Sequence, residues 1–299
     1  MNKVQHISQN ATLNSVEMIN SISSNIYGYA NNGHRAKRFK FSDYASGGQF
    51  KSNGYSWAQG KQEPRFGEWT KMMIKGRGLF EVQDPKTRET YYTRLGDFHL
   101  NATGFLVSSE GLKVQAIPLA AGVTKLQGPL PGDLSSYKKI DPNLVDPYNN
   151  PYTNNRQRLN PAGNPIAASG EVFLGLDPRN GRYLGKFDEI KVGEDGVIYG
   201  RDGRNIVSLY RLKVVDFNNL NGLQDIKDGV YYKATDRSGM PILKTNTDTV
   251  VIGEALEKSN SWIKVEAHAL TDAQRYFQSA SQIHKLADKI SGTAIEMIQ

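Results

Sequence analysis

The chain has 299 residues, of which 38% are hydrophobic, and its mean hydropathy is -0.54. A chain of this length can bury a substantial core, but so polar a composition leaves much of it at the surface, in loops or at interfaces. The net charge is +7 and Cys is absent, which excludes disulfides and thiolate metal sites.

The N-terminal region predicts a helix. Its apolar residues recur at spacings of mostly three or four, at Val4, Ile7, Ala11, Met18 and Ile22. Ser and Asn fill many of the other positions, so this helix should need a packing partner. The region has no apolar core of the secretory type, and no stretch of the chain approaches 18 apolar residues. We therefore expect no cleaved signal peptide and no insertion into a membrane.

The segment from His34 to Arg77 carries the positive charge. It contains ten Lys and Arg residues against three acidic ones, so it accounts for the whole imbalance. Basic residues interleaved with aromatic ones can bind nucleic acid through its phosphates and bases. No nucleic-acid-binding motif accompanies them, and we expect instead a surface for a protein partner that includes Lys37, Arg38 and Lys40.

Short β-branched or aromatic runs, bounded by Gly, Asn and Asp turns, fill the middle of the chain. Residues 79–83 and 89–93 are examples, and such runs predict an antiparallel β domain formed by 76–117 and 186–254. Between these parts, residues 118–185 are rich in Pro, Tyr and Asn. We expect a long insertion there that contacts a neighbouring subunit or an enclosing ring.

The C-terminal region predicts a helix from about Ser259 to Met297, which would extend roughly 58 Å. Small and apolar residues recur at spacings of three, four or seven, at Leu270, Ala273, Phe277, Ala280, Ala287, Ile290, Ala294 and Met297. A helix this long cannot bury itself in a small domain, and Ala lets a second helix approach closely. The predicted fold is α+β: long terminal helices, within 1–35 and 255–299, form a coiled-coil core domain. A basic linker covers 36–75, and the antiparallel β domain lies between the two ends.

The sequence does not predict an enzyme. The five His residues, at positions 6, 34, 99, 268 and 284, show no metal-ligand spacing, and no nucleophile motif is present. We expect no catalytic residue, no cofactor and no metal ion. The planar guanidinium of Arg94 should bind carbonyls or a carboxylate across a turn, with a solvated strand residue as the alternative.

Three motifs, in order along the chain, carry a resemblance to a known family. They are G-R-G-L-F-E-V at 76–82, Y-T-R-L-G-D-F at 92–98, and G-F-L-V at 104–107 followed by a further Gly. In these three motifs and their order, the chain resembles the flagellar hook and basal-body rod family. The matching residues are Gly76, Gly78, Phe80, Thr93, Arg94, Gly96, Phe98, Gly104 and Gly111. Gly76 and Gly78 alone would also suit a phosphate loop, but no helix is predicted after them.

Both ends of the chain are similar to the family as well. The L-E-K-S-N at 256–260 resembles the segment that opens the family's C-terminal helix, and Asn260 belongs to it. Gln274 and Arg275 match a later Q-R-x-F segment. Near the N-terminus the resemblance is partial and includes Asn25 and Ile26.

The resemblance implies a structural subunit of the bacterial flagellar basal body, in the periplasmic rod and closest to the proximal rod subunit, with the distal rod subunit second. Such a subunit assembles helically with itself and with other rod and hook subunits inside the enclosing rings. It leaves the cell through the flagellar type III export apparatus, transmits motor torque and surrounds the export channel.

The assembly interface should include both helix stripes, Asn25 and the three basic residues of the linker. A hook-type subunit, a secreted β-rich adhesion or binding protein, and a nucleic-acid-binding protein are the alternatives.

Overall fold

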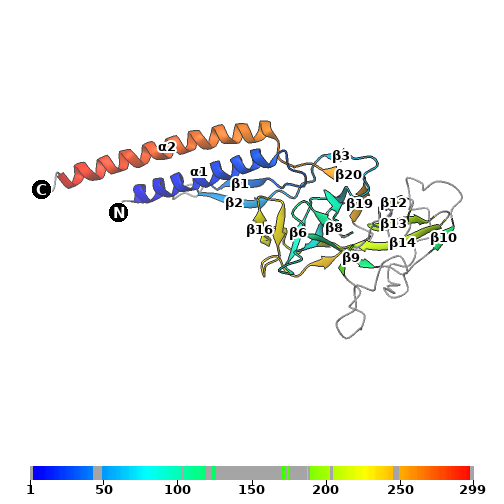
Figure 1. Ribbon diagram of the computed structural model, residues 1–299. Helices are drawn as coiled ribbons and strands as arrows, with labels where there is room; N and C mark the ends of the chain where they lie inside the picture. The colour runs from blue at the N-terminus through cyan, green and yellow to red at the C-terminus, as the bar shows by residue number, and fades with distance from the viewer. Residues whose placement is uncertain are drawn as a thin grey trace. The chain divides into compact units, whose positions relative to one another are not determined.

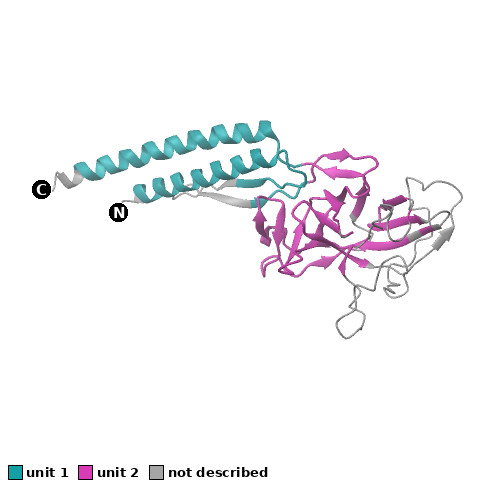
Figure 2. Cartoon of the chain, in the orientation of Figure 1, with its two compact units in different colours: residues 1–58, 259–299 teal, residues 59–258 magenta. Residues whose placement is uncertain are grey.

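The computed structural model describes residues 3–42, 49–102, 104–118, 123–125, 170–172, 174, 187, 189–202, 205–244 and 249–296. The chain divides into two compact units, which are coloured separately in Figure 2. Unit 1 contains residues 1–58 and 259–299, and unit 2 contains residues 59–258. Most of the predicted insertion, 118–185, lies outside the described residues.

Unit 1 is a pair of helices with a β-hairpin beside it. The helices are α1 (Lys3–Gly28) and α2 (Ile263–Glu296), and the hairpin consists of β1 (Lys37–Ser42) and β2 (Gln49–Tyr55). The helices run side by side in opposite directions, and the hairpin packs against α1 (Figure 1). Among the described residues, no helix is long and apolar enough to cross a bilayer.

The seam between the two helices is built from small and polar residues. On α1 the buried residues recur at helical spacing, at Ser8, Ala11, Ser15, Ser21, Ile22 and Asn25. On α2 they are Glu266, Ala273, Ala280 and Ala287. Such residues let two backbones approach closely, but they bury little apolar surface.

The predicted coiled-coil core domain is wrong. The described residues form two terminal helices and a large antiparallel β domain, which is still an α+β fold. The physical reason lies in the seam, because its Ser and Ala side chains cannot build a hydrophobic core. The large cluster of buried apolar side chains lies in unit 2.

Unit 2 is made of short strands. Their bounds are β3 (Gln62–Pro64), β4 (Met72–Gly76), β5 (Leu79–Gln83), β6 (Thr90–Thr93), β7 (Phe98–Leu100), β8 (Leu106–Ser108), β9 (Lys113–Pro118), β10 (Val123–Lys125), β11 (Gly170–Glu171), β12 (Glu189–Val192), β13 (Val197–Asp202), β14 (Asn205–Leu212), β15 (Val214–Asp216), β16 (Gln224–Lys227), β17 (Tyr231–Lys233), β18 (Ile242–Leu243), β19 (Thr249–Gly253) and β20 (Ala255–Glu257), with a 3-10 turn at Leu220–Gly222.

Most of these strands belong to one antiparallel sheet. Its main order, within the described residues, is β12-β13-β14-β9-β5-β6-β17-β16. β15 pairs with β5 and β18, while β4 with β19 and β3 with β20 form two separate ladders. Several neighbours are consecutive in the chain, which follows from the tight Gly, Asn and Asp turns between them.

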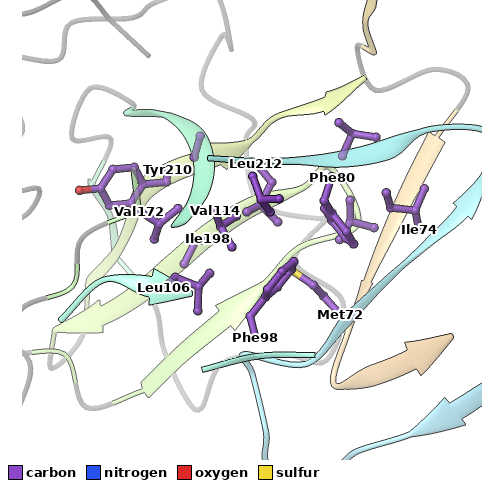
Figure 3. Close-up of a cluster of buried hydrophobic side chains, with 14 of the residues drawn as sticks. Met72, Ile74, Phe80, Phe98, Leu106, Val114, Val172, Ile198, Tyr210 and Leu212 are labelled. Atoms are coloured by element: carbon purple, nitrogen blue, oxygen red, sulfur yellow. The ribbon is translucent and has the colours of Figure 1, made fainter. Parts of the chain in front are cut away.

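The residues of the first two family motifs build the core of unit 2. Phe80 and Phe98 are fully buried and meet edge to face, with ring centroids 5.4 Å apart (Figure 3). Thr93 donates to the carbonyl of Val230 at 2.8 Å and accepts from the amide of Leu95 at 2.9 Å.

Gly96 has no room for a side chain. A Cβ there would lie 1.5 Å from the carbonyl oxygen of Met72.

Arg94 ties three segments of unit 2 together. Its Nη1 donates to the carbonyl of Ile74 at 2.6 Å and lies 3.4 Å from Glu257 Oε2, while its Nη2 donates to the carbonyl of Gly76. Glu257 Oε1 accepts from the amide of Gly60 at 2.7 Å. The guanidinium thus binds both carbonyls and a carboxylate, and the buried charge is paired.

The close approach at Gly96 generates a prediction. Gly96→Ala should lower the free energy of unfolding of unit 2 by about 3 kcal/mol or more, because the clashing atom is backbone and cannot rotate away. Chemical denaturation measures this value. Ser109→Ala, on an exposed turn, serves as the control, and equal stability of the two variants would contradict the packing described here.

Candidate assembly site

Asn25 joins the end of α1 to β1 and to α2. Its Oδ1 accepts from the amide of Lys37 at 2.8 Å, and its Nδ2 donates to the carbonyl of the same residue at 2.9 Å. Nδ2 also donates to Glu266 Oε2 at 3.0 Å, and the Ser261 hydroxyl donates to the Asn25 carbonyl at 2.8 Å. The side chain therefore satisfies backbone groups that the helix end and the strand start would leave unpaired.

Asn260 does the same for the segment that enters α2. Its Oδ1 accepts from the amide of Ala36 at 2.8 Å, and its Nδ2 donates to the carbonyls of Ser56 and Ala58 at 2.6 and 2.9 Å. Arg35, which is fully buried, also donates to the carbonyl of Ala58, at 3.0 Å. Because the amide of Asn260 both accepts and donates here, a carboxylate of the same shape could not replace it.

Glu266 is a buried carboxylate with both oxygens paired. It is 1% exposed, its Oε1 accepts from Arg38 Nη1 at 2.5 Å, and its Oε2 accepts from Asn25. Pairing of this kind is what a carboxylate needs once it leaves water. Asn25, Arg35, Asn260 and Glu266 are called the polar root of unit 1 below.

A second polar contact joins the helices far from the root. Ser8 Oγ lies 3.1 Å from His284 Nδ1, and Gln5 Nε2 donates to Asp288 Oδ1 at 2.8 Å. His284 Nε2 is 3.5 Å from Asp288 Oδ2. Polar pairs at both ends of a seam of small residues fix how α1 and α2 align, which Ser and Ala alone would not do.

Several large apolar side chains of the two helices are exposed. Ile283, Leu286 and Ile290 follow the spacing of one helix face and are 52%, 59% and 57% exposed. These three residues are called the outer stripe of α2 below. On α1, Val4, Ile7, Leu13 and Val16 are exposed as well.

On α2, burial raises the pKa of Tyr276 above its usual value.

The structure separates the residues expected at the assembly interface into three groups. Those buried inside unit 1 are Ala11, Ile22, Asn25, Ala273, Ala280 and Ala287. Those partly buried are Met18, Lys37, Arg38, Leu270 and Phe277, and those exposed are Ile7 and Ile290. The side chains of Lys40 and Ala294 lie outside what the structure describes.

Two of the three expected basic residues contact acidic residues of their own chain. Arg38 pairs with Glu266, and Lys37 lies 4.0 Å from Glu17. Of the residues that matched the family motifs, Asn260 lies in the polar root, whereas Gln274 and Arg275 are exposed on α2. Sequence reasoning missed Ser8, Ser15 and Glu266, because it searched for apolar stripes. Their helical spacing with Ala11 and Ala273 was the available signal.

A comparison with protein families gives a match to part of the chain. The family model described as the flagellar hook protein FlgE/F/G D1 domain matches residues 73–141. No curated protein matches the chain. The matched segment contains most of the motifs that carried the sequence resemblance, and it is similar to a domain of flagellar hook and rod proteins.

The polar root generates a prediction. Asn260→Ala leaves the Ala36 amide without its acceptor and removes two further hydrogen bonds, so the free energy of opening unit 1 should fall by about 3 kcal/mol. Hydrogen exchange in the first turns of α2 measures this opening. Gln274→Ala, exposed on the same helix, should change it by less than about 0.5 kcal/mol. Equal exchange in the two variants would show that Asn260 does not hold the root.

Proposed function

We propose that this chain is a rod subunit of the bacterial flagellar basal body, closest to the proximal rod subunit, and that unit 1 is its assembly element. The observation that carries the proposal is the arrangement of the helix pair. Mostly small and polar residues line its seam, while the outer stripe of Ile283, Leu286 and Ile290 remains exposed. Exposed apolar faces of this kind mark surfaces that bind other proteins.

The match of residues 73–141 to the hook protein D1 domain supports the same proposal from a different part of the chain. In it, unit 2 is a rigid body whose core is built by the motif residues Phe80, Thr93 and Phe98. Copies of the chain, together with related rod and hook subunits, assemble helically through their helix pairs. The resulting tube transmits torque and surrounds the export channel.

The proposal also covers the export of the chain, its location and the residues that assemble. The chain would leave the cell through the flagellar export apparatus and would contact the enclosing rings in the periplasm. That residues 1–35 and 255–299 carry the assembly contacts stays a prediction.

A hook-type subunit is the second candidate, because the matching family model is named for a hook protein. Labelling this subunit in purified hook–basal bodies and imaging them distinguishes the two positions. Label within the rod supports the first proposal, and label along the hook supports the second.

The outer stripe generates a test of the assembly role. Ile283→Glu combined with Leu286→Glu should abolish incorporation into the basal body, since each carboxylate would lose water at a packed interface. Both positions are more than half exposed in the single chain, so the stability of unit 1 should change by less than about 1 kcal/mol. Motility and the protein content of purified basal bodies measure the effect.

The matched control is Gln278→Glu, which adds a charge at an exposed polar position of the same helix. It should assemble normally. Normal assembly of the double variant would remove the outer stripe from the interface and, with it, the observation that carries this proposal.

A further inference from the structure

Two large apolar side chains of unit 2 are more exposed than any others described there. Phe66 is 85% exposed and Met240 is 82% exposed, and no other large hydrophobic residue described in unit 2 exceeds 47%. A single exposed apolar residue is common on a protein surface, so the setting of each one decides what it means.

Phe66 lies in a loop between two strand ladders. β3 pairs with β20 and β4 pairs with β19, and residues 65–71, which join β3 to β4, lie opposite Glu254 alone. Residues 65–71 are called the Phe66 loop below. At its base, the amide of Arg65 donates to the carbonyl of Glu254 at 2.7 Å. Trp69, further along the loop, packs against the hydrophobic core. The loop is therefore fixed to the body of unit 2.

The tip of the Phe66 loop is a tight turn. The amide of Glu68 donates to the carbonyl of Arg65 at 3.1 Å, and Gly67 has a φ of 81°. This hydrogen bond and a glycine at the third position are typical of a type II turn, in which Phe66 takes the second position. The backbone is thus set before any contact forms, so a partner that binds Phe66 orders little more than one side chain.

A second exposed apolar surface lies at β18. Met240, Ile242 and Leu243 are 82%, 47% and 45% exposed. Among the described strands, β18 pairs with β15 alone, so it is an edge strand. These three residues are called the β18 patch below. Neighbouring apolar side chains on an open strand edge mark a surface that another chain can cover.

The turn before β18 is held in place by hydrogen bonds. The Ser238 hydroxyl donates to the carbonyl of Thr235 at 2.8 Å, and the amide of Asn219 donates to the carbonyl of Ser238 at 3.3 Å. Arg237 lies in this turn and is exposed. A cation therefore lies shortly before the β18 patch in the chain.

The Phe66 loop and the β18 patch complement each other. The exposed Glu68 follows Phe66 and the exposed Arg237 precedes the patch, so the two surfaces carry opposite charges. The loop belongs to ladders that are separate from the main sheet, whereas β18 joins the main sheet through β15. Complementary surfaces at different places on one molecule let each copy bind the next, and such contacts generate open helical arrays.

We propose that the Phe66 loop of one copy packs on the β18 patch of a second copy, with Glu68 facing Arg237. This contact joins unit 2 to unit 2 and adds to the contacts of the helix pair. Aromatic side chains enclosed by apolar surroundings are favoured anchors of protein interfaces. The inference rests on the proposed assembly of this chain with copies of itself.

A photo-cross-linking amino acid tests the contact. p-Benzoylphenylalanine in place of Phe66 keeps an aromatic side chain and inserts into nearby C–H bonds under ultraviolet light. Irradiated hook–basal bodies should yield a covalent dimer of this chain. Trypsin cuts after Arg237 and Lys244, so the peptide linked in the second copy should be 238–244, which contains the whole β18 patch. The same amino acid in place of the exposed Ser109 should give no link to this peptide.

The outcomes separate this inference from the proposed function. A link to another peptide, to a different flagellar protein or within one chain, or no link at all, would overturn the inference and leave assembly into the basal body intact. Absence of the chain from purified hook–basal bodies would overturn the proposed function and this inference with it.

An exchange of charges tests which residues face each other. Combined with the cross-linker, Glu68→Arg and Arg237→Glu should each lower the yield of the covalent dimer by about tenfold, because like charges would then meet. The double variant restores an opposite pair and should recover most of the yield. Lys86→Glu, on an exposed turn, serves as the control. A double variant no better than the single ones would show that Glu68 does not face Arg237.

Discussion

Unit 1 depends on buried hydrogen bonds from two asparagines. Asn25 lies near the end of α1, and Asn260 lies just before α2. Backbone groups at such places lack the regular hydrogen-bond partners that a helix or a sheet provides. Asn25 supplies partners for Lys37, and Asn260 supplies them for Ala36, Ser56 and Ala58. Because these groups are distant in sequence, the same bonds that satisfy the backbone also join the two ends of the chain.

The small seam and the apolar exterior of the helix pair follow from one another. Ser and Ala let the helices approach closely, and several large apolar side chains are left on the outside. A single chain of this design buries little apolar surface between its helices. Contact of its exterior with other molecules would therefore bury more apolar surface than closure of the seam does. This favours an element that completes its packing only in an assembly.

The sequence predicted the two terminal helices and the β-rich middle, because helical spacing and short runs between turns are local signals. It failed on the role of the helices. Ile7 and Ile290 belong to the predicted apolar stripes but are exposed in the single chain, whereas the seam buries Ser8 and Ser15. Which face of a helix is buried depends on its neighbour, and no local pattern carries that information.

The polar root shows a second limit of sequence reasoning. Sequence reasoning identified Asn260 only through a motif, and it did not identify Glu266. The reason is that the partners of both residues lie more than 200 residues away in sequence. Arg38 was read as a surface residue for a partner protein, while it pairs with Glu266. Phe80, Thr93 and Gly96 were noticed through the same resemblance, and the structure supplies the physical reason, which is packing inside unit 2.

The central claim is that the outer stripe of α2 is covered by neighbouring subunits in the assembled structure. Since the chain has no Cys, Leu286→Cys introduces a single reporter thiol. Its reaction with a water-soluble maleimide can be measured in the soluble chain and in purified hook–basal bodies. Covered packing predicts rapid labelling of the soluble chain and strong protection in the assembly, whereas equal labelling rates in both would contradict the claim.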